Sequence, residues 1–493
     1  MITDGLSACS PVDATICAES IPDMSLEIFL HCVGKSVVKK GLRGLMGEKD
    51  FSTRLNSISK DIYERYRKRY TLPEWLSGME ECARAPRELI QRALESIYPR
   101  VRGKADPFTR PILDRPKVRS VVLQYMENVP GIVRAIFRRP SDPEGLTVPP
   151  GFSLRGASDM AKFLPVRSTR YRCGDKPVGN WVLVDLLGIG SFGEVWKAEH
   201  PTLKGIPAVA LKFCHDTELT DFIRHESALL NQIMMLSGSN TGIVKLQQAW
   251  LDSDPVCLEY EFVNGGNLCG LMADWQSMPR SRRTALALQM LMRLSRTMIP
   301  LHEETPPIVH RDLKPGNILV VFKADGKIDL KITDFGIGGW SPGSGSKVGR
   351  KVNNPKGINS TCTPVYASPE QQDGHPPNPA DDVHALGVIG IQLLLGDFNR
   401  IPAGDWDVEL RELGINLPMI AVLRKCLAQK ARRFKTAREL SKALEAVVEE
   451  HSGSQQLLPD LFLPPDSHLT GPPGKEKTPD LWLTKGPSRN RGK

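Results

Sequence analysis

The stretch His310–Leu319, HRDLKPGNIL, places a carboxylate, an ammonium group and an amide at fixed offsets before an apolar strand. Asp312 can orient an attacking hydroxyl and accept its proton, Lys314 can neutralise a transferring phosphate, and Asn317 can hold Mg²⁺. These are the groups that phosphoryl transfer from ATP to a hydroxyl needs. A run this long seldom arises by chance. The same chemistry also requires residues elsewhere in the chain that bind the ATP phosphates and a second metal ligand.

A glycine-rich loop, GIGSFG at 188–193, follows a strand expected over 181–187. Its glycines let backbone amides approach phosphates that side chains would keep away. The pattern alone is weak evidence, because it also opens a helix in dinucleotide-binding folds. Here the next residues, EVWKA at 194–198, have the composition of a strand. They favour a strand–turn–strand flap over ATP, with Val195 covering the adenine ring.

A lysine, Lys212, ends the run VALK inside the next expected strand, 208–213. It can reach the α- and β-phosphates, and it then needs a carboxylate to hold its position. Glu226, in a helical stretch over 219–235, is the expected partner. An isolated Lys–Glu pair is usually a solvated surface pair, but the glycine loop upstream favours the functional interpretation here.

A second metal ligand is predicted at Asp334, which opens the tripeptide Asp334-Phe335-Gly336 behind a strand expected over 330–333. Mg²⁺ prefers a few carboxylate and amide oxygens plus substrate phosphates, so no His or Cys ligand is required. Alone, the tripeptide would form a turn in most proteins.

Three further residues are expected to be structural. Glu370 can pair with Arg433 as a buried bridge, and Asp382 can tie the catalytic loop to a core helix. Neither expectation requires contact with a phosphate or a metal.

Across about residues 181–450 the chain resembles the eukaryotic-type (Hanks-type) protein Ser/Thr kinases, with these elements in the family's order. The resemblance implies an α+β, bilobal protein kinase fold: a β-rich N-lobe and a helical C-lobe, preceded here by a mostly helical N-terminal region. ATP would bind between the lobes, at a hinge formed by Glu261-Phe262-Val263, with Tyr260 as a bulky gatekeeper.

The resemblance also implies roles for individual residues. Asp312 and Lys314 would be catalytic, and Asn317 and Asp334 would bind Mg²⁺. ATP would be held by Gly188, Ile189, Gly190, Ser191, Phe192, Gly193, Val195, Ala210, Lys212, Glu226, Glu261, Val263 and Leu319.

Local sequence refines the resemblance. Lys314, two residues after the base, resembles the Ser/Thr pattern rather than the tyrosine-kinase pattern, and Thr363 would belong to the substrate-contact loop. The run SPEQQ at 368–372 resembles bacterial members. Cys362 and His384 depart from the family's usual Gly and Trp, but neither would touch the phosphate or the metals.

A regulatory feature is predicted beside the base. In the family, an arginine at the position of Arg311 often pairs with a phosphate on the activation segment, which here runs over 334–370. Ser360 and Thr361 are the candidate autophosphorylation sites. A segment that is ordered without phosphorylation is the alternative, because phosphate is one of several ways to order such a loop.

The 493 residues carry a net charge of +9, and +8 of it falls in residues 1–170. We expect a mostly helical basic region over 1–140, a linker or flank over 141–179, a kinase domain over 180–451 and a disordered tail over 452–493.

The basic stretch YERYRKRY at 63–70 has two interpretations. One is a contact with nucleic acid or an anionic membrane. The other is an amphipathic helix with Ile62, Tyr63, Tyr66 and Tyr70 packed inward and the arginines solvated. The second is favoured because +8 is modest for a nucleic-acid domain. Residues 1–170 are then expected to be a regulatory or partner-binding module, and a nucleic-acid partner is not expected.

Cysteine usage and apolar segments indicate the cellular compartment in which the protein is expected. The 10 cysteines are scattered without a CxxC pair, which predicts reduced thiols rather than disulfides or a zinc site. There is no signal-peptide pattern, and the longest apolar-rich run, Val383–Leu395, is shorter than the roughly 20 residues that span a bilayer. A soluble, cytoplasmic protein without a transmembrane segment is expected.

Three functions remain in competition. The first is an active kinase that phosphorylates Ser/Thr residues of protein substrates and of itself. The second is a pseudokinase scaffold, which would usually lack part of the ATP-binding and catalytic set. The third is a nucleic-acid-binding protein with a kinase appendage, which rests on the basic stretch alone. The complete set favours the active kinase.

Overall fold

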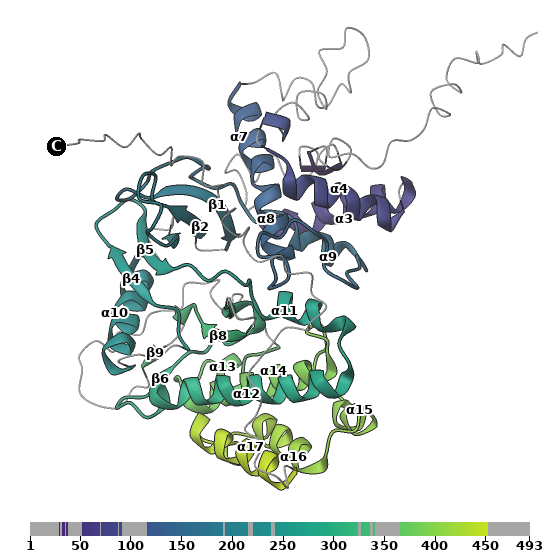
Figure 1. Ribbon diagram of the computed structural model, residues 1–493, viewed down its shortest axis with the longest axis vertical. Coiled ribbons are helices and arrows are strands. Elements are labelled where there is room, and N and C mark those ends of the chain that lie inside the picture. The colour runs from purple at the N-terminus through teal and green to yellow at the C-terminus, as the bar shows by residue number, and fades with distance from the viewer. Residues whose placement is uncertain are drawn as a thin grey trace, which may run out of the picture.

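The computed structural model describes residues 29, 32–34, 36–37, 52–69, 71–86, 88–90, 116–190, 193–214, 220–237, 242–323, 327–335, 339–340 and 365–451. A β-sheet lies above a helical body, and a group of N-terminal helices lies beside the sheet (Figure 1). The two expected lobes are therefore present, and the α+β class is confirmed.

The N-lobe is built on a five-stranded antiparallel sheet in the order β1-β2-β3-β5-β4. Its strands are β1 (Val182–Ile189), β2 (Gly193–Glu199), β3 (Val209–Cys214), β4 (Leu246–Trp250) and β5 (Val256–Glu261). Side chains alternate along β3, with Leu211 buried on one face and Lys212 half-buried on the other. The helix α10 (Thr220–Ser237) contacts β4 and β5.

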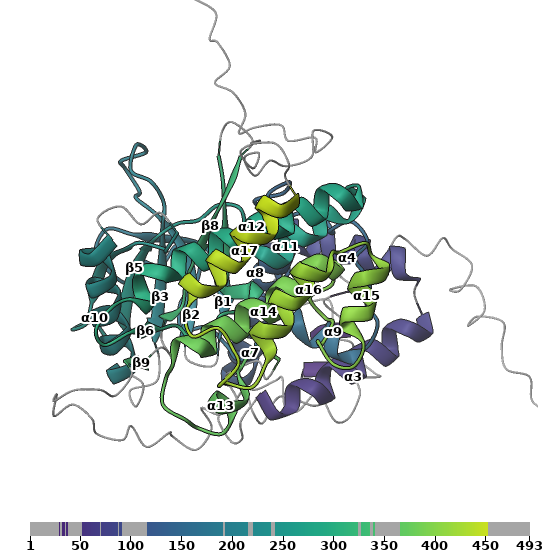
Figure 2. The ribbon, with the colours of Figure 1, turned by 90° about the horizontal axis from the view of Figure 1, so that it is seen from below.

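The C-lobe is mainly helical, and Figure 2 shows α12, α14, α16 and α17 packed together. Its helices are α11 (Leu268–Asp274), α12 (Arg280–His302), α13 (Pro369–Gln372), α14 (Pro379–Leu395), α15 (Trp406–Glu412), α16 (Leu417–Leu427) and α17 (Ala437–His451). Helix α14 is buried along nearly its whole length, because it is apolar on all sides. Asn378 and Asp381 form a capping box at its start, and Gly396 ends it in a left-handed conformation.

Short elements of the C-lobe surround the catalytic loop. Two 3₁₀ turns, η4 (Trp275–Ser277) and η5 (Pro315–Asn317), accompany two small antiparallel sheets. These pair β6 (Ile308–Val309) with β9 (Gly339–Trp340), and β7 (Ile318–Phe322) with β8 (Ile328–Ile332).

The N-terminal region forms a helical module with its own core. Its helices are α3 (Ser52–Arg69), α4 (Leu72–Arg84), α7 (Pro116–Glu127), α8 (Val129–Phe137) and α9 (Ala157–Lys162). Trp75, Tyr125 and Phe137 are buried in one apolar cluster. The predicted linker or flank contributes to the same cluster through Met160 and Phe163. Residues 148–164 therefore pack as part of the module, whereas Tyr171 and Val178 join the apolar cluster of the N-lobe sheet.

The basic stretch lies at the end of α3. Ile62 is buried in the module and Tyr63 is partly buried against it, as the amphipathic interpretation predicts. The side chain of Tyr66 and the whole of Tyr70 lie outside the described residues.

The module also covers the outer face of the N-lobe sheet. Ile132 of α8 shares an apolar cluster with Trp196, Leu211 and Phe213. The ring of Tyr171, from the flank, lies 4.7 Å from that of Phe213, measured between centroids. This leaves the opposite face of the sheet turned toward the C-lobe.

Among the described residues, none of the helices combines the length and the apolar character needed to cross a bilayer.

Candidate active site

The glycine loop lies between the paired strands β1 and β2, which confirms that the residues after it form a strand and not a helix. Gly188 lies opposite Val195 in the antiparallel register, and the amide of Gly190 donates to the carbonyl of Gly193 at 2.9 Å. A Cβ atom on Gly193 would lie 1.8 Å from the carbonyl oxygen of Phe213. The third glycine is therefore required by the sheet itself. Ser191 and Phe192 lie outside the described residues.

Three predicted ATP-binding residues share the sheet face opposite the outer cluster. Val195 pairs with Lys212, and Ala210 pairs with Tyr260, so these side chains project from the same face. Tyr260 is 6% exposed and belongs to the core cluster shared with the C-lobe. The register thus places Val195, Ala210 and Lys212 together beside the predicted gatekeeper.

Lys212 contacts the predicted metal ligand across the two lobes. Its Nζ atom donates to Oδ1 of Asp334 at 2.9 Å. Burial would raise the pKa of Asp334, but the charge and hydrogen bond of Lys212 hold that pKa below its ordinary value. The expected partner, Glu226, lies on α10, but its side chain is outside the described residues. The Lys212–Glu226 pair stays a prediction.

The catalytic loop brings Asp312, Lys314 and Asn317 into one cluster. Oδ2 of Asp312 accepts from Nζ of Lys314 at 2.8 Å and from Nδ2 of Asn317 at 2.9 Å. Nδ2 of Asn317 also donates to the carbonyl of Asp312 at 2.9 Å. Both amide hydrogens are thereby used, which fixes the orientation of the Asn317 side chain.

His310, which the motif contains but for which the sequence suggested no separate role, connects the catalytic loop to the Asp334 segment. Its Nδ1 atom accepts from the amide of Asp312 at 3.2 Å, so the proton resides on Nε2, which donates to the carbonyl of Thr333 at 2.9 Å. Its ring lies 4.5 Å from that of Phe335. One histidine thus bonds both to the predicted base and to the residue before the predicted metal ligand.

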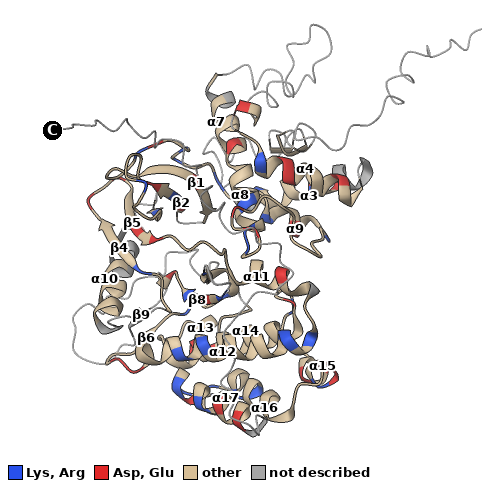
Figure 3. Cartoon of the chain, viewed as in Figure 1, with Lys and Arg blue, Asp and Glu red and all other residues tan. Residues whose placement is uncertain are grey.

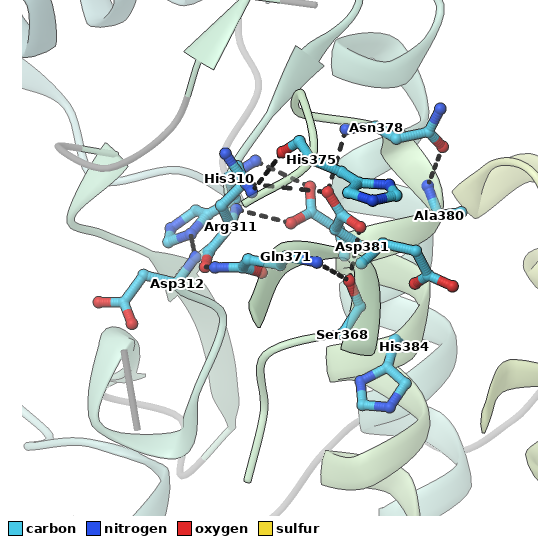
Figure 4. Close-up of polar contacts among 12 residues, drawn as sticks. His310, Arg311, Asp312, Ser368, Gln371, His375, Asn378, Ala380, Asp381 and His384 are labelled. Carbon is cyan, nitrogen blue, oxygen red and sulfur yellow. Dashed lines mark hydrogen bonds and ion pairs between the residues drawn. The ribbon is translucent and has the colours of Figure 1, made fainter. Parts of the chain in front are cut away.

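Asp382 anchors the catalytic loop to α14, as predicted (Figure 4 shows this neighbourhood). Its carboxylate is fully buried and accepts from the amides of His310 and Arg311, both at 2.8 Å. Nε2 of His302 donates a third bond at 3.1 Å, while the amide of Ala437 donates to Nδ1 of the same ring. Burial would raise the pKa of Asp382, but these bonds hold it low.

Arg311 lies beside the base in a left-handed conformation, with φ of +63°. Such a conformation is strained for a residue other than glycine, and it is held by the Asp382 bond and by Gln371, whose Nε2 donates to the Arg311 carbonyl at 2.7 Å (Figure 4). The guanidinium donates to the carbonyl of His375 and lies 3.7 Å from Oδ2 of Asp381. Both candidate phosphorylation sites, Ser360 and Thr361, lie outside the described residues.

The predicted structural bridge between Glu370 and Arg433 is confirmed. Nη1 of Arg433 donates to Oε2 of Glu370 at 2.9 Å, and the Arg433 side chain is completely buried. The same guanidinium also donates to the carbonyls of Ala428 and Ala380. Thr363, the expected substrate-contact residue just upstream, lies outside the described residues.

The predicted hinge is bonded to both lobes. Glu261 exchanges two bonds with Lys245 and forms an ion pair with Lys331 of β8. The amide of Gly265 donates to the carbonyl of Val320 at 2.9 Å. Val263 and Leu319 are partly buried against the same core. The hinge residues therefore lie over β7 and β8, at the edge of the interlobe face.

Comparisons with known proteins identify the family of this chain. The protein kinase domain family matches residues 181–450. Serine/threonine-protein kinase PknA of Mycobacterium tuberculosis is 32% identical over 246 residues, covering 48% of this chain and 50% of the relative. Serine/threonine-protein kinase A of Synechocystis is 29% identical over 225 residues, covering 45% of this chain and 41% of the relative.

A solved structure is also similar. The crystal structure of the Mycobacterium tuberculosis PknI kinase domain has a TM-score of 0.40 and 21% sequence identity, covering 56% of this chain and 99% of that chain. This chain spans about half the length, or less, of the curated relatives it matches, at 50% and 41%. Because the domain match covers more than half of the sequence, this chain belongs to the protein kinase family, in its Hanks-type branch, alongside bacterial serine/threonine-protein kinases.

Proposed function

We propose that this protein is an ATP-dependent protein serine/threonine kinase, which transfers the γ-phosphate of ATP to Ser/Thr hydroxyls of protein substrates and of itself. The observation that carries the proposal is the convergence of Asp312, Lys314 and Asn317 in one hydrogen-bonded cluster, with Lys212 and Asp334 in contact across the lobes. This set combines a base, two cations and two oxygen ligands.

The chemistry follows from the positions of these groups. Asp312 accepts the proton of the substrate hydroxyl. At the same time, the oxygen of that hydroxyl forms a bond to the γ-phosphorus, and the bond between the γ-phosphorus and the β–γ bridging oxygen breaks. Lys314, 2.8 Å from the carboxylate of Asp312, is placed to offset negative charge on the transferring phosphate. Lys212 would hold the α- and β-phosphates from the N-lobe side.

The residues fit the Mg²⁺ that the family implies. Nδ2 of Asn317 is occupied by Asp312, which leaves Oδ1 as the ligand atom of that amide. Asp334 supplies a carboxylate whose pKa is held low by Lys212, so that it stays ionised at neutral pH. Oxygen donors of these two kinds suit Mg²⁺. When bound, the ion would neutralise phosphate charge and orient the terminal phosphate.

The pseudokinase alternative is disfavoured by this same set. Lys212, Asp312, Asn317 and Asp334 are all present and described, and Glu226 occupies the predicted place on α10. A scaffold without turnover would not need Asp312 and Asn317 to be held in register by two bonds. The nucleic-acid function rests only on the basic stretch of α3, and we do not propose it.

Regulation and location are further parts of the proposal. Phosphorylation at Ser360 or Thr361 would place charge where Arg311 can reach it, because this arginine already lies beside Asp381 at the start of α14. Residues 1–170 would receive a regulatory partner. A cytoplasmic location fits the scattered cysteines, among which Cys82, Cys257, Cys269 and Cys426 are free thiols.

Labelling with [γ-³²P]ATP tests the enzyme proposal. Wild-type protein and the Asp334→Ala variant are each incubated with Mg²⁺, a generic acceptor protein and no other kinase. Label that depends on Asp334 supports the proposal, and equal or absent labelling in both proteins rejects it. Mass spectrometry of wild type beside Asp312→Asn then tests autophosphorylation, which is wrong if neither carries phosphate between residues 341 and 363.

A further inference from the structure

Two adjacent arginines directly after α8, Arg138 and Arg139, connect the N-terminal module to both lobes. Asp185 of β1 accepts from Arg134 Nη2 and from Arg138 Nη2, both at 2.6 Å. The side chain of Arg138 is 8% exposed and that of Asp185 is 17% exposed, so the cluster is shielded from solvent. Charge-assisted bonds of this kind fix geometry more firmly than exposed pairs do.

Apolar contacts attach the same helix to the same strand. A Cβ atom on Gly131 would lie 2.8 Å from Cβ of Leu186, so only glycine permits this approach of α8 to β1. Ile132 is buried in the cluster that includes Leu186. Figure 1 shows α8 beside β1, and Figure 3 marks the basic residues of α8 at this border. Because β1 leads into the glycine loop at Gly188, α8 holds the strand that carries the loop.

The next residue, Arg139, contacts the C-lobe. Its Nε atom lies 3.0 Å from Oδ1 of Asp274, the last residue of α11. Ser141 adds two bonds to that carboxylate, from its amide at 3.0 Å and from its hydroxyl at 2.5 Å. Arg139 and Asp274 are 6% and 7% exposed, so this second contact is also buried.

Backbone packing closes the contact at the C-lobe side of the hinge. A Cβ atom on Gly266 would lie 2.5 Å from the carbonyl oxygen of Arg138. A Cβ atom on Gly270 would lie 2.4 Å from the same oxygen. Gly266 also has a φ of +70°. The two glycines thus leave room for the Arg138 backbone directly against the segment between hinge and α11.

We propose that Arg138 and Arg139 are positioning residues that fix the spacing of the two lobes, and thereby the nucleotide site, through Asp185 on one side and Asp274 on the other. This proposal rests on the proposed function. It adds that residues outside the region that matches the kinase family influence nucleotide binding. We call Arg138, Arg139, Asp185 and Asp274 the interlobe clamp.

The sign of the effect follows from the site. With the clamp in place, Lys212 of the N-lobe reaches Asp334 of the C-lobe at 2.9 Å. Loosening the clamp lets the lobes separate, so the phosphate-binding lysine and the metal ligand spend less time at this spacing. Nucleotide affinity should therefore fall more than the rate of the chemical step, because each catalytic group stays intact within its own lobe.

Two variants weaken the C-lobe contact in different ways. Asp274→Ala removes the carboxylate, while Arg139 keeps its bonds to Phe137 and Thr147. Gly270→Ala leaves every charge in place but sets a methyl group against the Arg138 carbonyl, at a helix position where alanine is otherwise favoured. The matched control is Asp407→Asn, which weakens ion pairs with Arg411 and Arg424 far along the C-lobe.

The test uses the full chain and three measurements: KM for ATP, kcat, and the affinity for MgADP by isothermal titration calorimetry. Both variants should raise KM and the dissociation constant of MgADP by about tenfold, a typical coupling between sites, with a smaller change in kcat. Amide exchange over residues 262–271 should also quicken. Asp407→Asn should resemble wild type in all of these.

The outcomes separate the two proposals. If wild-type protein transfers no phosphate, the proposed function fails, but MgADP affinity and hinge exchange still test the clamp. If both variants keep wild-type affinity and hinge exchange while folded by circular dichroism, the clamp is overturned and these contacts are packing alone. If Asp274→Ala does not fold, Gly270→Ala decides the question by the same criteria.

Discussion

Nζ of Lys212, on β3 of the N-lobe, lies 2.9 Å from Oδ1 of Asp334, which follows β8 in the C-lobe. The contact places the proposed phosphate-binding cation and the proposed metal ligand at the same point between the lobes. It also holds the pKa of Asp334 low, against the effect of burial. In the proposed function, each group would therefore help the other to bind a nucleotide with Mg²⁺.

Replacing Lys212 by methionine should abolish most of the activity. The change removes the cation but retains an unbranched side chain of similar length on the half-buried face of β3. We expect kcat/KM for ATP to fall by about 100-fold or more, because phosphate positioning and charge are lost together. Steady-state kinetics measure this, with Lys204→Met, which is exposed in the segment between β2 and β3, as the control that should stay near wild type. Equal activity in both variants would contradict the assigned role.

Replacing Asp312 by asparagine should reduce kcat and leave the KM for ATP close to wild type. The base is lost, and general base catalysis contributes about 10²- to 10⁴-fold. The amide also turns hydrogen donors toward Lys314 and Asn317, which both donate to this carboxylate in the wild type. Single-turnover phosphate transfer gives the rate, and MgADP titration verifies that the nucleotide site persists. A kcat within twofold of wild type would exclude Asp312 as the base.

Breaking the Glu370–Arg433 bridge should destabilise the C-lobe. Glu370→Gln leaves the fully buried Arg433 without its counter-charge, and loss of one partner of a buried pair costs about 3–5 kcal/mol. Urea denaturation measures the free energy of unfolding. Glu409→Gln is the control, since its pair with Arg400 is exposed on both sides and should contribute about 1 kcal/mol or less. If the two variants lose similar amounts of unfolding free energy, the Glu370–Arg433 bridge contributes no more to stability than an exposed ion pair.

His384 should make stability depend on pH. Burial lowers the pKa of His384, and the nearby charge of Arg433 lowers it further, against a bond with the Tyr366 carbonyl. In the unfolded chain the pKa returns to about 6.5. Below pH 6.5 the unfolded state therefore binds more protons than the folded state, and the free energy of unfolding falls until the folded pKa is passed.

The His384→Asn variant tests this pH dependence. Asparagine can keep the bond from the Nδ position to Tyr366 but does not titrate in this range. Thermal unfolding of wild type and variant is compared at pH 7.5 and pH 5.5. The wild type should lose more stability on acidification than the variant, and parallel losses would assign the pH dependence to other groups.

The sequence predicted the parts of the site that lie in contiguous motifs. Asp312 and Asn317 are five positions apart, so their meeting in one loop follows from local chain geometry. The partners Glu370 and Arg433 were predicted from family order, since nothing local links residues 63 apart. His302 was missed because it is one of many polar residues on α12, and only the fold brings it to Asp382.

The interlobe clamp could not be predicted from the sequence. Arg139 and Asp274 lie in no motif, and no sequence pattern indicates that two opposite charges 135 positions apart form an ion pair. The segment 141–179 was interpreted as a linker or extended flank because it is rich in Pro, Gly, Ser and Arg. Leu154, Met160 and Phe163 are nevertheless buried in the module. Burial of irregular segments depends on the surface they meet, which a single sequence does not show.

The covered outer face of the N-lobe sheet has a consequence for where this protein can be divided. The family match begins at residue 181, but Ile132 and Tyr171 shield Phe213 and its neighbours from upstream of that point. A fragment starting at residue 180 would expose Trp196, Leu211 and Phe213 to water as a contiguous apolar surface, which favours aggregation. The segment that matches the protein kinase family is thus shorter than the smallest piece expected to stay in solution without aggregating.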